Sequence, residues 1–239
     1  MTAFIICCFL FGAGLGLFGI WYKLPNNVGK RGEKKVAKIL AKCEGTVLND
    51  YMIIDDKGKS HQIDHILVNK KGVFVIETKN YKGRIYGDDN SERWTQVLNY
   101  GKIKNKFYSP VKQNLTHCRN LMKVLPNGTK VITIIVFVKN NTSYVKSLCT
   151  INLRQLYSTV NNEPDLYTDE EVQTFVNILN DKKATDVTDE QHVAEIKENQ
   201  YKVEHNICPR YGGNLVLRHG KNGDFYGCEN FPKCRYIKK

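Results

Sequence analysis

Two strand-forming runs joined by a short turn constrain the fold more than any other part of the sequence. HQIDHILV at residues 61–68 and GVFVIETK at residues 72–79 are rich in Val, Ile and Phe, and they are joined through NKKG. This pattern predicts an antiparallel hairpin. If the turn is centred on its two lysines, Asp64 on the first strand faces Glu77 on the second.

The predicted hairpin gathers charged side chains on one face. Two carboxylates whose Cβ atoms are about 5 Å apart repel each other unless a cation lies between them. Lys79 is two residues after Glu77 and is therefore expected on the same face. His61 and His65 stand at odd offsets from Asp64, so we expect them on the opposite face. The arrangement suits an oxygen-binding divalent cation, Mg²⁺ or Mn²⁺, at Asp64 and Glu77. The simpler interpretation is a solvent-facing, weakly stabilising set of ion pairs.

A metal held there beside an ammonium group is suited to phosphodiester cleavage. The metal polarises the scissile phosphate and lowers the pKa of an attacking water, while the Lys79 ammonium orients that water and offsets developing charge. The whole chain is basic, with 36 Lys and Arg, 24 Asp and Glu and a formal net charge of +12. This excess indicates a polyanionic partner, either nucleic acid or anionic lipid. Lys82 and Arg84, just after the hairpin, are candidate phosphate contacts or solvated surface charges.

The remaining patterns predict a mixed α/β or α+β domain that ends near residue 160. Further strands are expected at TVLNDYMII, residues 46–54, and at KVITIIVFV, residues 130–138, the second as a central strand covered on both faces. Helices are expected at residues 28–43, 111–125 and about 170–179. The core-facing stripe of the second helix is expected to comprise Val111, Leu115, Cys118, Met122 and Leu125.

The hairpin and its surroundings resemble a known family. HQIDHILVNKKGVFVIETKNYKGRIYG is similar to the core of the nuclease-related domain (NERD), a branch of the PD-(D/E)xK restriction-endonuclease-like superfamily. GKRGE at residues 29–33 matches the family's GxxGE signature, and Trp94 with SPVKQ at residues 109–113 matches its W…xPxxQ pattern, with Ser109 where the family usually has Asn. The resemblance covers about residues 28–140. It implies a restriction-endonuclease-like mixed sheet flanked by helices. It also implies a catalytic set of Glu33, Asp64, Glu77, Lys79 and Gln113.

The first residues form an uncharged apolar run. TAFIICCFLFGAGLGLFGIWY, from Thr2 to Tyr22, would span roughly 31 Å as a helix, the thickness of a bilayer core. A cleaved secretory signal fits less well, because no Lys or Arg precedes the run and the run is long for a signal. Lys23, Lys30 and Arg31 follow it. We therefore expect a single-pass anchor in the cell membrane, with the domains after Tyr22 in the cytoplasm.

A small cysteine-containing module is expected at the end of the sequence. Cys208, Cys228 and Cys234 lie in short knuckles around a predicted hairpin, and such a tiny domain commonly replaces its missing core with a zinc ion. The stretch resembles the C-terminal zinc finger of type IA DNA topoisomerases, including the GxFxGCxNxPxC segment. Tyr211 stands where that family has the second cysteine of its first knuckle, so only three family ligands remain.

The missing fourth ligand leaves two alternatives open. Either His205 or His219 completes a Cys3His site, or the ribbon is degenerate and binds zinc weakly or not at all. A folded module would contact single-stranded DNA or RNA through its cations. These are Arg210, Arg218, Lys221, Lys233 and Arg235. The fragment carries no cleavage domain, so no topoisomerase activity is implied.

These features predict four segments and a function. The segments are an anchor at residues 1–22, a nuclease-related domain at 23–160, a helix and acidic linker at 161–204, and the zinc-ribbon-like module at 205–239. The scattered single cysteines favour a reducing compartment over a disulfide framework. We expect a membrane-anchored, metal-dependent nuclease that acts on DNA in preference to RNA. The alternatives are an inactive nucleic-acid-binding protein at the membrane and an envelope or signalling scaffold.

Overall fold

The computed structural model of the chain describes residues 28–184, 189–220 and 223–238. The chain divides after Lys183 into two compact units. The apolar run at residues 2–22, expected to be a membrane anchor, lies outside the described residues. Within the described ranges, no helix has the length and apolarity needed to cross a bilayer.

A five-stranded mixed sheet forms the centre of the first unit, with the strand order β1-β2-β3-β7-β9. The first three strands are antiparallel, whereas β3, β7 and β9 run parallel to one another. Their bounds are β1 Thr46–Ile54, β2 Ser60–Asn69, β3 Gly72–Lys79, β7 Val131–Phe137 and β9 Thr150–Asn152. All four predicted strands are therefore present, and β7 lies inside the sheet as its apolar sequence indicated.

The β2–β3 hairpin has the predicted register. The ladder runs from the His65–Ile76 pair to the turn, and its next position brings Asp64 beside Glu77. The β1–β2 ladder, by contrast, contains no Asp50–Asp64 pair although both residues are described, and Asp50 has a left-handed φ of 49°. Because of this local distortion, the side chains on the two sides of Asp64 do not alternate regularly between the two faces of the sheet.

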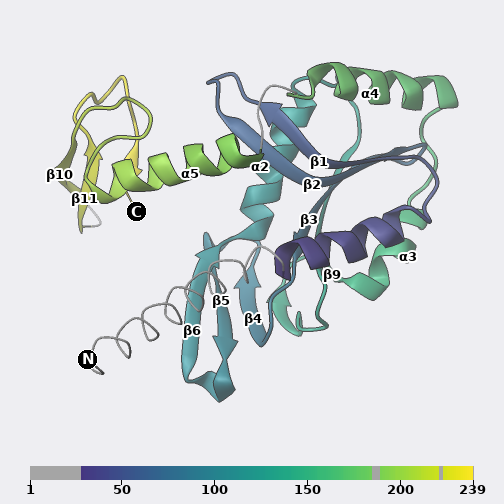
Figure 1. The fold of residues 1–239 in the computed structure, drawn as a ribbon, viewed down its shortest axis with the longest axis horizontal. Coiled ribbons are helices and arrows are strands. Elements are labelled where there is room, and N and C mark those ends of the chain that lie inside the picture. Colours follow the sequence, from purple (N-terminus) through teal and green to yellow (C-terminus); the bar gives the residue numbers. More distant parts are fainter. Residues whose placement is uncertain (1–27, 185–188, 221–222, 239) are drawn as a thin grey trace, which may run out of the picture. The chain divides into compact units, whose positions relative to one another are not determined.

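Helices cover both faces of the sheet (Figure 1). One face packs against α2 (Pro110–Met122) and α4 (Asp169–Lys182), with Cys118, Leu121 and Leu179 buried there. The other face packs against the helix of residues 28–40 and α3 (Leu156–Asn161). Because both faces are covered, the strands are apolar along most of their length, as is usual in α/β folds. The mixed sheet and its helices are consistent with a nuclease-like fold.

The expected apolar stripe of α2 is wrong at two positions. Leu115 is 41% exposed and Met122 is 55% exposed. Asn114 and His117 are buried instead, together with Leu121. The helix is rotated from its apolar pattern because its polar residues make contacts with the sheet.

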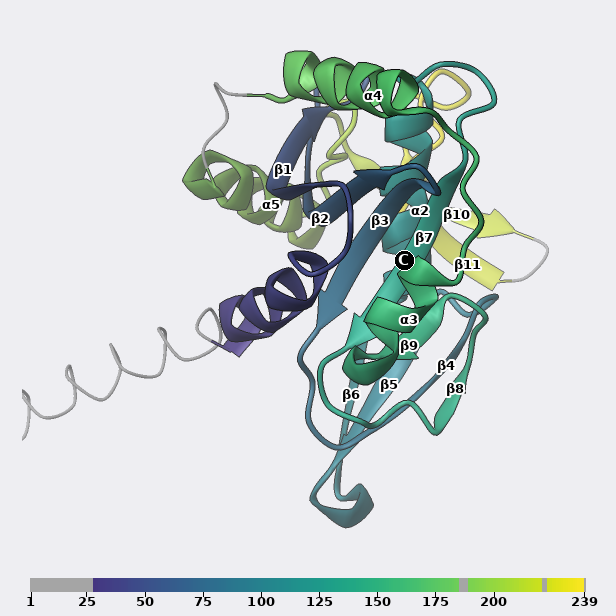
Figure 2. The same cartoon turned by 90° about the vertical axis from the view of Figure 1, so that its right-hand side faces the viewer.

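A second sheet, with the order β6-β5-β4-β8, was not predicted. Its strands are β4 Arg84–Asp88, β5 Arg93–Leu98, β6 Ile103–Tyr108 and β8 Tyr144–Lys146, and the short helix η1 (Asn99–Gly101) links β5 to β6. Ile85 and Trp94 on one face of this sheet pack against Ile135, Phe137 and Val111. Figure 2 shows this sheet at the end of the unit opposite to α4. The buried face fixes the second sheet to the first and to α2.

The first unit continues past the expected domain end near residue 160. Phe175, Val176 and Leu179 of α4 are buried in the core beneath the sheet. A capping box starts α4, since the Thr168 and Glu171 side chains each bond to the other's backbone N–H. The short helix η2 (Leu153–Gln155) precedes α3.

The second unit contains one helix and a small antiparallel sheet. Helix α5 (Asp189–Glu204) occupies much of the segment expected to be a linker. The sheet has the order β10-β11-β12, with bounds Leu215–Gly220, Gly223–Cys228 and Ile237–Lys238. The β10–β11 pair is the hairpin that the sequence predicted around the cysteines.

Candidate active site

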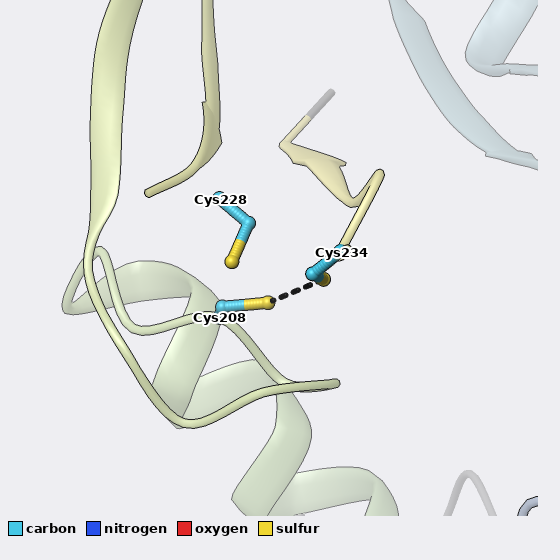
Figure 3. A group of neighbouring side chains, drawn as sticks. All are labelled: Cys208, Cys228 and Cys234. Carbon is cyan, nitrogen blue, oxygen red and sulfur yellow. Dashed lines mark hydrogen bonds between the residues drawn. The ribbon is translucent and has the colours of Figure 1, made fainter. Parts of the chain in front are cut away.

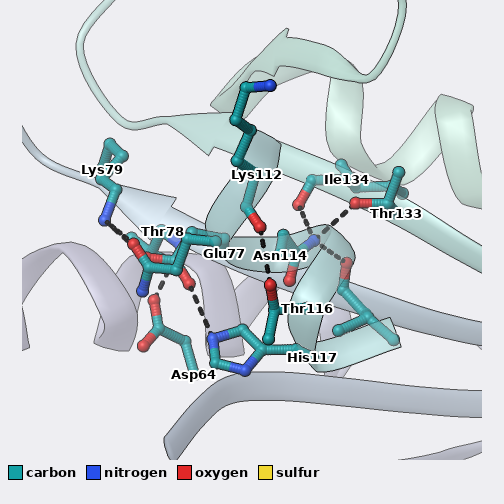
Figure 4. Close-up of polar contacts among 12 residues, drawn as sticks. Asp64, Glu77, Thr78, Lys79, Lys112, Asn114, Thr116, His117, Thr133 and Ile134 are labelled. Carbon is teal, nitrogen blue, oxygen red and sulfur yellow. Dashed lines mark hydrogen bonds and ion pairs between the residues drawn. The ribbon is translucent and has the colours of Figure 1, made fainter. Parts of the chain in front are cut away.

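Strands β2 and β3 bring together the two predicted carboxylates. Asp64 Oδ2 accepts a hydrogen bond from the Thr78 backbone N–H at 2.8 Å, so the Asp64 side chain is held across the hairpin (Figure 4). Glu77 is 2% exposed. A carboxylate buried to this degree is not an ordinary surface residue, because burial without compensation disfavours its charge.

Lys79 and Gln113 complete a hydrogen-bonded chain with Glu77. The Lys79 Nζ atom donates to Glu77 Oε1 at 2.5 Å and to Gln113 Oε1 at 3.2 Å. Gln113 is placed by the start of α2, where the Ser109 side chain accepts from the Lys112 backbone N–H as the helix cap. The structure therefore brings Gln113, assigned by resemblance alone, into contact with the ammonium that the hairpin positions.

The electrostatics of the site reflect two carboxylates in a confined space. Burial, and then the neighbouring Glu77 charge, raise the pKa of Asp64 well above its ordinary value, although the Thr78 N–H and Lys79 oppose the shift. Burial acts to lower the pKa of Lys79, but the charge and hydrogen bond of Glu77 raise it above its ordinary value. Lys79 is thus a persistent cation. The site holds one ammonium against two acidic groups.

Glu33, on the helix of residues 28–40, lies near enough to Asp64 to raise the pKa of that residue further. The close approach of this helix to the end of β3 depends on Gly32, where a Cβ atom would lie 2.8 Å from Asn80 Cβ. Asn80 Nδ2 also donates to the Val28 backbone oxygen at 2.7 Å. The GxxGE motif therefore has a packing role at its second glycine and a charge role at Glu33.

His117 was not singled out from the sequence. It is 5% exposed, and its Nε2 atom lies 3.9 Å from Glu77 Oε2. His61 contacts His117, with ring centroids 6.1 Å apart, so the expectation that His61 points away from the site is wrong. The distortion opposite Asp64 explains the error, because Ile63 and Ile66 pack into the same core although they are three residues apart. His65 stands apart as expected, bonded through Nδ1 to Asn49.

Asn114 ties α2 to the strands that carry the site. Its Nδ2 atom donates to the Val75 backbone oxygen and to Thr133 Oγ1, both at 2.8 Å. Val75 is two residues before Glu77, so this contact fixes the distance between α2 and strand β3. An asparagine inside an apolar stripe was the sequence signal for this contact, and it was not recognised.

The side chains present fit a hard divalent cation. Glu77 Oε2 is buried and has no hydrogen-bond partner in the described part of the chain, and it lies beside a second carboxylate. Two closely spaced carboxylates are compensated by an oxygen-binding divalent ion, which lowers their mutual repulsion. The residues that would hold it are Asp64 and Glu77.

The second unit brings its three predicted cysteine ligands together. The ligand atoms of Cys208, Cys228 and Cys234 all lie within 4.8 Å of one another, and the Cys208 and Cys234 Sγ atoms are 3.7 Å apart (Figure 3). With Leu215 they form nearly the whole core of the module. Burial raises the pKa of Cys228 to about 11, whereas the Tyr236 backbone N–H lowers that of Cys234. A core of this size is typical of small modules that a bound metal stabilises.

Neither histidine proposed as fourth ligand joins the three cysteines within the described residues. His205 stacks on Tyr201 with ring centroids 3.9 Å apart and contacts the Tyr201 backbone oxygen. His219 is bonded to Asp224 at 2.6 Å. Tyr211, at the position of the missing cysteine, is 56% exposed. The cluster therefore offers three protein ligands, and the Cys3His alternative is not what the structure shows.

The candidate nucleic-acid-binding residues differ in their exposure to solvent. Lys82, Arg84, Arg210, Lys233 and Arg235 are exposed. Arg218 is turned inward: its Nη2 atom donates to the Cys228 backbone oxygen at 3.1 Å. Lys221 lies outside the described residues.

Comparison with known proteins agrees with both resemblances. The family model described as a nuclease-related domain matches residues 28–138, and the model described as a topoisomerase DNA binding C4 zinc finger matches residues 205–239. The chain thus contains a nuclease-related domain and a topoisomerase-type zinc ribbon sequence, and these domains indicate a role associated with nucleic acid.

Individual relatives match only parts of the chain. An uncharacterised protein of Bacillus anthracis is 36% identical over 117 residues, which are 48% of this chain and 54% of that protein. DNA topoisomerase 1 of Methanocaldococcus jannaschii is 49% identical over 43 residues, 18% of this chain and 6% of the enzyme. An uncharacterised Escherichia coli protein is 48% identical over 31 residues, 13% of this chain and 17% of that protein. The chain thus spans about half of the first relative and a small part of the others. No solved structure matches the chain.

Proposed function

We propose that this protein is a metal-dependent nuclease that hydrolyses phosphodiester bonds in DNA, with RNA as the less favoured substrate. The observation that carries the proposal is the hydrogen-bonded set of Glu77, Lys79 and Gln113 beside Asp64, which is held by the Thr78 N–H. One buried Glu77 oxygen has no hydrogen-bond partner in the described part of the chain, and His117 Nε2 lies 3.9 Å from it. An inactive nucleic-acid-binding protein has no need to retain a buried glutamate beside a second carboxylate that repels it. The nuclease-related domain match supports the same class of function.

Each residue has a role in the proposed reaction. Asp64 and Glu77 would hold Mg²⁺ or Mn²⁺, which would polarise the phosphate and lower the pKa of a bound water. The Lys79 ammonium faces the same site and stabilises negative charge on the phosphoryl oxygens. Gln113 orients Lys79, and Glu33 adds a negative charge near Asp64.

The proposal is tested by cleavage assays on the full chain in detergent. Single-stranded and duplex DNA and RNA are incubated with Mg²⁺ or Mn²⁺, using wild type, Asp64→Asn and the control Asp165→Asn, an exposed acid of the same unit. We expect metal-dependent cleavage by wild type and the control, and its loss in Asp64→Asn. Equal background cleavage rates in all three proteins would refute the nuclease proposal, and nucleic-acid binding without catalysis would then be the function that remains.

We also propose that residues 2–22 anchor the chain in the cell membrane, with the domains on the cytoplasmic side. The support is the uncharged apolar run followed by Lys23, Lys30 and Arg31. In alkaline extraction of membranes from expressing cells, the chain should stay with the lipid pellet. Its release into the supernatant would contradict the anchor.

For the second unit, we propose a three-cysteine zinc site that supports contact with DNA. The cluster of Cys208, Cys228 and Cys234 and the match to a DNA-binding zinc finger support this role. Arg210, Lys233 and Arg235 would contact phosphates. Metal analysis of the purified chain should give about one zinc per chain; a chain free of zinc would overturn the site.

A further inference from the structure

The second sheet of the first unit has one buried and one open face. Ile85, Trp94, Phe107 and Val145 point to the buried face. Because side chains alternate along each strand, their neighbours point to the other face. On β4 these neighbours are Arg84 and Tyr86, both exposed. The open face is therefore defined by register rather than by exposure alone.

Three tyrosines lie on the open face. Tyr86 pairs with Tyr144 of β8, and their rings stack with centroids 4.8 Å apart and planes inclined by 22°. They are 36% and 50% exposed. Tyr108, at the far strand β6, is 50% exposed and pairs with Arg93. Such large rings on the surface, away from any core, are available for stacking.

The same face is strongly basic. Register places Thr95 of β5 between Tyr86 and Lys106, and Val97 between Arg84 and Lys104. The cations of the face are Arg84, Arg93, Lys104, Lys106 and Lys146, all exposed. The guanidinium of Arg84 lies over the Tyr144 ring at 5.9 Å. Asp88 is an acidic residue of β4 on this face. Its carboxylate accepts hydrogen bonds from Asn90 and Ser91 and so caps the turn that follows β4.

The open face is rigidly connected to the candidate active site. Arg84 follows Lys79 by one short segment, and Asn141 Nδ2 holds that segment through the Tyr81 oxygen at 3.0 Å and the Gly83 oxygen at 2.9 Å. Gly83 has a φ of 78°, and a Cβ atom there would lie 2.3 Å from the Val97 oxygen. The segment that joins the face to Lys79 is therefore held in place by hydrogen bonds and close packing.

We infer that this basic tyrosine face, made by β6, β5, β4 and β8, binds single-stranded DNA and holds it for the proposed active site. The four strands are about 14 Å across, a width on which sheet proteins stack two or three bases. Bases of a duplex are already stacked on one another, so exposed rings favour an unpaired strand. The choice of DNA rests on the proposed function.

Binding to the full chain in detergent tests the inference. The probe is a fluorescein-labelled 20-nucleotide oligo-dT, without added magnesium, and the readout is fluorescence anisotropy. Tyr86→Ala with Tyr144→Ala should raise the Kd by about tenfold or more, since each stacked base contributes about 5- to 150-fold. Tyr86→Phe with Tyr144→Phe keeps the rings and should bind within about threefold of wild type. The control Tyr157→Ala removes an exposed tyrosine of α3 and should have no effect.

A charge variant provides a second readout. Lys104→Gln with Lys106→Gln should reduce the slope of log K against log salt by about 1.4, or 0.7 per lost phosphate contact. Lys57→Gln with Lys59→Gln, in the β1–β2 turn, is the matched control. Unchanged affinity in the alanine pair, or equal loss in the alanine and phenylalanine pairs, would overturn the inference.

Photocrosslinking with 5-iododeoxyuridine in the oligonucleotide locates the bound strand. Crosslinks should fall on peptides that contain Tyr86, Tyr108 or Tyr144, and crosslinks confined to residues 205–239 would overturn the inference.

The crosslinking and cleavage experiments distinguish failure of the binding face from failure of the proposed nuclease. If wild type crosslinks at this face but cleaves no better than Asp64→Asn, the nuclease proposal fails and the binding face stands. Metal-dependent cleavage without such crosslinks would support the nuclease proposal and overturn the binding face.

Discussion

At the residue scale, Asp64 and Glu77 are expected to lower stability when no metal is bound. Glu77 is buried and Asp64 is half-buried, and burial together with the Glu77 charge raises the pKa of Asp64. Asp64→Asn should therefore stabilise the metal-free protein by about 1 kcal/mol, a Tm increase of about 2–4 °C. Mg²⁺ should raise the Tm of wild type and leave that of the variant unchanged. A metal-free Tm lower in Asp64→Asn than in wild type would contradict this account.

His117 should affect metal binding through Glu77. Its Nε2 atom lies 3.9 Å from the Oε2 atom that faces the proposed cation. His117→Phe keeps most of the volume and removes the nitrogens, so we expect Mg²⁺ affinity to fall by about tenfold, as for other residues that orient metal ligands. Calorimetric titration with Mg²⁺ measures this. The control Leu115→Ala changes an exposed residue of the same helix, and equal affinity in all three proteins would count against a positioning role.

Much of the site was predictable at the residue scale, and its exceptions have physical causes. The alternation of β2 and β3 and the turn between them correctly gave the register that brings Asp64 beside Glu77. The prediction for His61 failed because Asp50 distorts the neighbouring strand, which no residue pattern in β2 indicates. Gln113 could be assigned only by resemblance, because its role depends on where α2 starts relative to Lys79.

At the element scale, the Tyr51 hydroxyl links β1 to α4, and it should make the free energy of unfolding depend on pH in the alkaline range. The hydroxyl donates to the Leu179 oxygen at 2.6 Å, and burial raises the pKa of Tyr51 to about 12. The folded protein keeps this proton where the unfolded chain loses it, so the stabilisation is present below about pH 10 and is lost as the pH rises towards 12.

Tyr51→Phe should cost about 1 kcal/mol at pH 8. Between pH 10 and 11 the wild type should lose stability more steeply than the variant, by on the order of 1 kcal/mol. Urea unfolding at pH 8, 10 and 11 measures both effects, with Tyr157→Phe, a change at an exposed tyrosine of α3, as the control. Parallel pH profiles for wild type and Tyr51→Phe would rule out the buried phenol as the cause.

Elements with one apolar face were harder to predict than elements buried on both. β3 and β7 have long apolar runs, β1 and β2 have shorter ones, and all four were located from the sequence. β6 reads IKNKFY, and its lysines face solvent, so its sequence resembles a loop. Helix α5 was hard to predict for the same reason, since DEQHVAEIKENQYKVE has little apolar periodicity. The open sheet face was missed for the same reason that makes it a candidate binding surface.

At the scale of the whole molecule, two compact units with separate cores predict two unfolding transitions. The second unit has a core of three cysteines and one leucine. If the proposed zinc site holds the small core together, a zinc chelator should abolish its transition and leave that of the first unit within about 1 °C. Tyr211→Cys supplies a fourth thiolate and should make the second transition resist higher chelator concentrations. Calorimetric scans with and without chelator test this, and an unaltered second transition would show that zinc is not part of the fold.

The central claim for the whole molecule is that Asp64, Glu77 and Lys79 form a metal-dependent phosphodiesterase centre. The most direct measurement is the single-turnover cleavage rate of DNA at saturating Mg²⁺ for wild type and for Glu77→Gln, which removes the metal-binding charge and keeps the side-chain shape. We expect the variant to lose cleavage by about 10³-fold or more while it remains folded. A Glu77→Gln rate within about twofold of wild type, or no metal-dependent cleavage by wild type at all, would contradict the account.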